Sequence, residues 1–200
     1  MSGHGDTKKT AVWGGADVLI APASATIPTG LAAFSGDWKF VGLLDGGQGF
    51  EEAIEVESTD FNAWGFGVVA TTYRGQKTTK TFTALEENAT VMGLVYDTAG
   101  MTFSDEDGTY IGDLAVKDFT EKVRIAFVTY SGSTEKRFIS KNYATIAPSA
   151  AGTESEEALQ SKGFTATVFP TEGRVLWYAV KDTNDDSSSS SSSESSSSSS

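Results

Sequence analysis

Residues 80–97, KTFTALEENATVMGLVYD, decide the fold because the spacing of apolar residues changes within them. Polar Thr81 and Thr83 flank Phe82, which is the alternation of a strand end. Further along, apolar side chains recur at intervals of three and four, which places them on one face of a helix. These residues are Leu85, Ala89, Met92 and Tyr96. We therefore expect a strand that leads directly into a helix.

Three details bear on the bounds and packing of this helix. Thr83 and Glu86 form a T-x-x-E capping box, which satisfies backbone N–H groups of the first turn, and Gly100 is a suitable stop. Gly93 lies inside the helix, where glycine costs about 1 kcal/mol relative to alanine. It either marks a close approach to a sheet or is simply tolerated. Because the apolar stripe is narrow, we expect the helix to lie on a sheet.

The rest of the chain is patterned mainly as β-strand. The clearest strand is KVRIAFVTY at residues 122–130, which a Ser-Gly-Ser turn joins to the next strand. Near the end of the chain we expect Val175 and Trp177 to face the core. The expected strands cover residues 16–21, 38–44, 50–57, 68–73, 122–130, 136–143, 163–169 and 174–181. Seven to nine strands with one helix predict a mainly β fold, an antiparallel β-sandwich or barrel with one flanking α-helix.

The composition indicates one soluble globular domain. The chain has 200 residues, of which 38% are hydrophobic and 21% charged. We expect a flexible N-terminus at 1–10, a β domain at 11–182 and a disordered Ser-rich tail at 183–200. No run approaches the ~18 apolar residues that a membrane-spanning helix needs.

Catalytic chemistry has little support in the sequence. The chain has no cysteine, and its single histidine, His4, lies in the Gly-rich N-terminus, so a Ser or Cys nucleophile lacks a credible base. A carboxylate pair for glycoside hydrolysis stays open, although charged runs are normally solvated surface. DEDG at 105–108 and GGQG at 46–49 do not match calcium or phosphate loops and are interpreted as turns. We expect no enzyme activity, no metal and no cofactor.

Residues 45–75 form the most unusual segment. TDFNAWGFG at 59–67 is too apolar for a solvated loop and too irregular for a core strand. Long excursions of this kind are usually functional, and exposed aromatic side chains would form a surface that another chain covers. Two alternatives stay open: the aromatics belong to the core, or they stack on sugars. The candidate contact residues are Phe50, Phe61, Trp64, Phe66 and Tyr73.

The net charge of the chain is −12. Three acidic residues, Asp185, Asp186 and Glu194, lie in the tail, so subtracting them leaves −9 for the rest. An acidic body disfavours binding to a phosphate backbone, which needs clustered Lys and Arg, and repels nucleic acid instead.

The order of the segments resembles the major tail tube proteins of long-tailed bacteriophages, particularly those of phages that infect actinobacteria. WKFVGLLDGGQGF at 38–50 is followed by EVESTDFNAWG at 55–65 and by VVATTYRGQKTTKTFTALEENATVMGLVYD at 68–97. The later strands follow in the order of the family as well. The resemblance covers about residues 16–180 and leaves out the Ser-rich tail.

The resemblance implies the phage tail-tube fold and a structural virion protein, assembled in the host cytoplasm. Copies of it form hexameric rings that stack into the tube through which the genome leaves the capsid. Tape-measure, tail terminator and baseplate or tip proteins would be its partners. The 45–75 segment would reach neighbouring subunits, and carboxylates would line a lumen through which DNA passes without specific binding. The candidate acids are Glu51, Glu52, Glu55 and Glu57.

The alternative function is a carbohydrate-binding or adhesin-like β-sandwich module. In that case the exposed aromatic side chains of the 45–75 segment would stack on sugar rings instead of on a neighbouring subunit.

Overall fold

The computed structural model consists mainly of antiparallel β-strands. It describes residues 11–104, 108–150, 152 and 159–183. The predictions for residues 1–10, for the first three residues of the 105–108 turn and for the tail after Thr183 lie outside the described residues. The described elements are β1 (Gly15–Pro22), β2 (Lys39–Phe40), β3 (Glu51–Ala63), β4 (Gly67–Ala84), α1 (Ala89–Val95), β5 (Tyr96–Phe103), β6 (Tyr110–Val116), β7 (Val123–Ser131), β8 (Thr134–Ser140), β9 (Tyr143–Pro148), β10 (Lys162–Phe169) and β11 (Trp177–Thr183).

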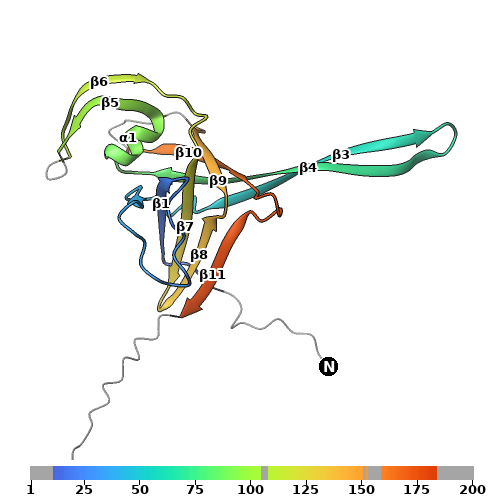
Figure 1. Ribbon diagram of the computed structural model, residues 1–200, viewed down its shortest axis with the longest axis horizontal. Helices are drawn as coiled ribbons and strands as arrows, with labels where there is room; N and C mark the ends of the chain where they lie inside the picture. Colours follow the sequence, from blue (N-terminus) through green and yellow to red (C-terminus); the bar gives the residue numbers. More distant parts are fainter. Residues whose placement is uncertain (1–10, 105–107, 151, 153–158, 184–200) are drawn as a thin grey trace, which may run out of the picture.

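The nine strands of the main sheet form two packed layers, with α1 beside them (Figure 1). One layer has the order β2-β1-β7-β8-β11 and the other β9-β10-β4-β3, and they join where Val123 of β7 pairs with Ala144 of β9. The core between the layers is built around Phe82, Phe127 and Phe164, which are almost fully buried. The predicted antiparallel sandwich with one flanking helix is therefore confirmed.

The layer that contains β7 is buried on both faces. Its second face carries Leu19, Ala126 and Val128, which pack under the segment between β1 and β2, with Trp38 of that segment among them. This second burial explains why the sequence of β7 contains the continuous apolar run IAFV instead of strict alternation.

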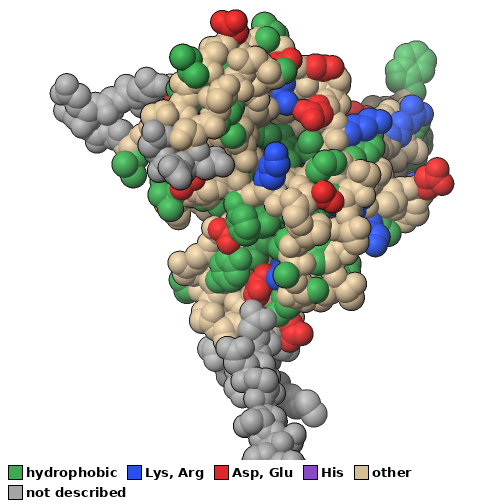
Figure 2. Space-filling view, turned by 60° about the vertical axis from the view of Figure 1, so that its left-hand side comes forward, with side chains coloured by type: hydrophobic (Ala, Val, Ile, Leu, Met, Phe, Trp, Pro, Cys, Tyr) green, Lys and Arg blue, Asp and Glu red, His purple; other side chains and the backbone are tan. Residues whose placement is uncertain are grey.

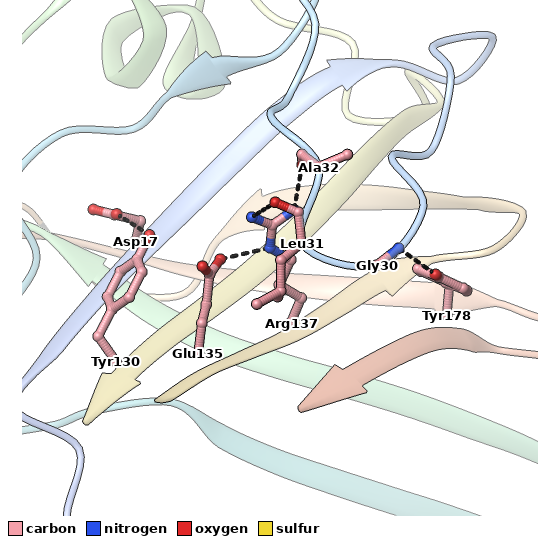
Figure 3. Close-up of polar contacts among 8 residues, drawn as sticks. All are labelled: Asp17, Gly30, Leu31, Ala32, Tyr130, Glu135, Arg137 and Tyr178. Carbon is pink, nitrogen blue, oxygen red and sulfur yellow. Dashed lines mark hydrogen bonds and ion pairs between the residues drawn. The ribbon is translucent and has the colours of Figure 1, made fainter. Parts of the chain in front are cut away.

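The covering segment is fixed by Arg137 of β8 (Figure 3). Its guanidinium donates hydrogen bonds to the carbonyl oxygens of Ala32 and Leu31, at 2.7 and 3.2 Å. It also donates to the Glu135 carboxylate at 2.5 Å, and both charged residues are only 5% exposed. Nearby, the Tyr178 hydroxyl accepts a hydrogen bond from a backbone N–H of the same segment. Arg137 thus joins a buried ion pair to the backbone of a loop more than 100 residues away.

The predicted capping box of Thr83 and Glu86 is wrong. Thr83 lies inside β4, opposite Gly163 of β10, so pairing in the sheet outweighs the local capping pattern. Asn88 caps α1 instead: its side-chain oxygen accepts a hydrogen bond from the Val91 N–H at 2.9 Å. An N-cap of this kind contributes about 1 kcal/mol.

The helix is also shorter than the sequence pattern predicts. It ends at Val95, and Tyr96 begins β5, which runs through the expected stop at Gly100. A Cβ atom on Gly93 would meet only the Thr98 hydroxyl, at 3.8 Å, which is an ordinary contact. The proposed close approach at Gly93 is therefore wrong, and the glycine is simply tolerated.

Other differences concern strand number and ends. Strands β5 and β6 form a separate two-stranded sheet, which the sequence does not predict: the start of β5 carries the helical pattern, and residues 110–119 are only weakly patterned. The expected strand at 38–44 shortens to β2, and the last strand begins at Trp177. Trp177 packs against the core, as expected, whereas Val175 is 47% exposed in the preceding loop, so its predicted core position is wrong.

Candidate functional site: an exposed β-arm

The feature that stands out from the sandwich is a long two-stranded arm (Figure 1). We define the arm as residues 53–77, the parts of β3 and β4 around their connecting turn. In the described structure every residue of the arm except Ala63 is exposed. The irregular sequence of this segment has a physical cause. Since neither face of the arm packs on the core of its own chain, no burial imposes a period of two on its side chains.

The pairing of β3 with β4 determines which side chains share a face of the arm. Alternation places Ile54, Val56 and Tyr73 on one face, which continues the core-facing side of β4, and we call this the inner face. The opposite, outer face carries Glu55 next to Lys77. Two register shifts, after Val56 and after Phe61, leave one extra residue of β4 in each case. Such β-bulges twist and bend a hairpin.

Four of the five candidate aromatic residues lie on the arm and are exposed. Trp64 and Phe66 form its tip, with 103% and 85% of their surface accessible, and Tyr73 is 74% accessible. Phe61 is 47% accessible. The alternative that these four residues belong to the core of their own subunit is therefore wrong. Phe50 lies elsewhere: it is half-buried, and its ring centroid is 5.0 Å from that of Phe127 in the core.

The four candidate acids are divided between the two faces of β3. Glu51, Glu55 and Glu57 point to the outer side, where Lys77 and Arg74 pair with the last two of them across the ladder. The period of two in a strand was a signal in the sequence for this division. Acidic side chains are also spread over the face shown in Figure 2, with hydrophobic side chains exposed between them.

Glu52 points inward, and although the residue is exposed, its carboxylate contacts the buried Lys80 at the base of the arm. Its carboxylate lies 3.6 Å from the Lys80 ammonium and accepts a hydrogen bond from the Trp177 indole at 3.2 Å. Lys80 is 6% exposed, and its ammonium lies 5.0 Å from the ring centroid of Phe127 and 4.7 Å from that of Phe138. Sequence reasoning missed this cluster, although Lys80 stands two residues before Phe82 on the same strand face.

Burial gives Lys80 an abnormal protonation equilibrium. Desolvation lowers the pKa of its ammonium, Glu52 opposes that shift, and Lys136 reinforces it. The folded chain therefore loses this proton at a lower pH than the unfolded chain does, so the lysine favours folding more as pH rises toward its ordinary value of 10.5.

We therefore expect Lys80→Met to change the pH dependence of stability. The free energy of unfolding of the wild type, relative to that of the variant, should increase between neutral pH and 10.5. Urea unfolding followed by circular dichroism over this range measures the slope. Lys77→Met, at an exposed position of the same strand, is the matched control. If both variants change the slope equally, burial of Lys80 is not the cause.

The described residues contain no group of three or more His, Asp and Glu side chains placed to hold a metal ion. In the same part of the chain no helix is long and apolar enough to cross a membrane. A scan against protein-family models and a search of curated proteins found no significant match to this chain.

Proposed function

We propose that this chain is a structural protein that assembles with copies of itself into stacked hexameric rings, forming the tail tube of a long-tailed bacteriophage. The observation that carries the proposal is the arm, which places Trp64, Phe66 and Tyr73 in water on a two-stranded projection. Large exposed apolar groups mark surfaces that partners cover, and aromatic residues are enriched in such interfaces.

The ends of the sheet support assembly as well. β3 and β11 terminate the path of hydrogen-bonded strands, so in the described residues each has one edge that pairs with no further strand. Exposed edges bind other chains unless something blocks them. In a ring, a neighbouring copy would cover each edge. The unpaired backbone groups would then bind the neighbour instead of causing aggregation.

The charge supports a passage for DNA rather than a binding site for it. The chain without its tail carries −9. On the outer side of β3, Glu51 adds to this excess of acid, whereas Lys77 and Arg74 lie opposite Glu55 and Glu57. Carboxylates that face a channel would repel phosphates, so DNA would pass through without adhering. The tape-measure, terminator and baseplate proteins follow as partners only from the resemblance to tail tube proteins.

Negative-stain electron microscopy of the purified chain over a concentration series tests the proposal, with light scattering alongside. We expect hollow tubes, or rings with a central hole, above a threshold concentration. A persistent monomer at high concentration would contradict self-assembly of the chain alone. The fully exposed Trp64 indole also suits sugar stacking, so binding of that monomer to a glycan array would support the carbohydrate-binding alternative.

A further inference from the structure

The arm meets the sandwich at a groove. Its volume is about 460 Å³, within the range of pockets that hold ligands of small-molecule size. Val56 and Tyr73 from the inner face of the arm form one wall. Pro170, Arg174 and Leu176 from the connection between β10 and β11 form the other.

The second wall has an unusual backbone conformation. Arg174 has φ +62°, and within the described residues no other non-glycine residue has a positive φ. Left-handed backbone is uncommon for a residue with a side chain, and such residues cluster at ligand-binding sites as well as in turns. Hydrogen bonds around Thr171 hold the turn: its carbonyl accepts from the Arg174 N–H at 2.9 Å, and its own N–H donates to the Val175 carbonyl at 2.9 Å. The turn thus places Arg174 beside the groove with its backbone held by two hydrogen bonds.

We propose that the groove receives the Trp64 tip of the arm of a second copy of this chain. The indole would lie between Val56, Tyr73 and Leu176, with the Arg174 guanidinium over its face. A cation over tryptophan is the most favourable of the cation–π pairs. The Trp64 tip and the groove are both exposed in one subunit. The tip offers an aromatic ring, and the groove offers apolar side chains and a cation. The inference rests on the proposed self-assembly and adds the site at which the arm docks.

The length of the arm excludes docking into the groove of the same chain. Trp64 lies eight residues beyond Val56 along the arm, which corresponds to about 26 Å. The ladder between the two strands is paired through that distance, from Val56 with Gln76 to Ala63 with Gly67. The tip therefore cannot fold back, and the contact has to be intermolecular. A tip that fits a different surface of the next copy makes a heterologous contact, which generates rings or filaments.

Disulfide trapping tests the contact, because the chain has no native cysteine. Ala63→Cys places a thiol beside the tip, and Gln76→Cys places one in the groove, without removing any side chain proposed to interact. The two purified variants are mixed, oxidised mildly and digested, and the disulfide-linked peptides are quantified by mass spectrometry. In the control mixture, Ser133→Cys replaces Gln76→Cys as the partner of Ala63→Cys. We expect at least about tenfold more linkage between positions 63 and 76 than between positions 63 and 133, because docking raises the effective thiol concentration. Ser133 lies in the exposed turn between β7 and β8.

A second comparison separates docking from chance collisions. Adding Trp64→Ala to the Ala63→Cys copy should reduce the linkage to the level of the Ser133→Cys control. Assembly into tubes without a disulfide between the two introduced cysteines would overturn the docking site and leave the proposed function standing. A linkage that persists without Trp64 would overturn the role of the indole. Absence of both linkage and assembly would overturn the inference and the proposed function together.

Discussion

Trp64→Ala should greatly raise the concentration needed for tube assembly while leaving a folded subunit. The indole is fully exposed at the tip of the arm, so its removal takes nothing from the core. Aromatic hot spots at interfaces contribute about 2 kcal/mol or more, so we expect the concentration needed for assembly to rise at least about 30-fold. Light scattering over a dilution series measures that threshold, and circular dichroism checks the fold.

The control for this prediction is Ile111→Ala, which removes a comparably exposed apolar side chain from β6, outside the arm. It should assemble at the concentration of the wild type. Normal tubes from Trp64→Ala would refute the proposed role of the tip. An equal loss of assembly in both variants would show that general surface hydrophobicity, and not the arm, drives association.

Arg137→Ala should destabilise the subunit more than any surface substitution. Removing one member of a buried ion pair typically costs about 3–5 kcal/mol. Here the same guanidinium also donates to the carbonyl oxygens of Leu31 and Ala32, which would lose their donor. The segment over Val128 and Ile139 would loosen with it. Urea unfolding at neutral pH measures the loss in free energy.

Two variants make this prediction specific. Arg74→Ala removes an exposed arginine from the arm and should change stability by no more than about 0.5 kcal/mol. Arg137→Met combined with Glu135→Leu removes both buried charges and should recover part of the loss, because buried ion pairs can be replaced by apolar side chains. Recovery should stay partial, since the loop carbonyls still lack their donor. A loss below about 1 kcal/mol in Arg137→Ala would contradict the predicted role.

The sequence predicts the sandwich well where burial imposes a pattern. The strand at 122–130 and the strand at 163–169 are recognisable because their side chains face a core. Local signals failed where tertiary pairing competed with them. Thr83 belongs to a capping pattern, but its backbone pairs with β10. Asn88 is therefore the N-cap residue of α1. Such a choice depends on a strand that is distant in the sequence and is not readable locally.

The candidate site was predictable in part. Composition marked Trp64 and Phe66 as unusual, yet it could not decide between a core and an exposed position, since large aromatics suit both. Only the strand pairing shows that they end a projection. The Lys80 cluster and the groove at Arg174 bring together side chains that are far apart in the sequence, so no local sequence pattern predicts them.

The arm also differs from the sandwich in how quickly it re-forms after local unfolding. Its ladder pairs residues that are close in sequence, from Ala63 with Gly67 outward. We therefore expect its exposed hydrogen bonds to open locally without unfolding the core. A hairpin of this kind closes again within about 1–10 μs. The time between collisions of dilute subunits is much longer than this closing time. The arm would therefore be folded whenever a subunit meets its neighbour. Docking of the arm would then be detected as slower amide hydrogen exchange in residues 53–77.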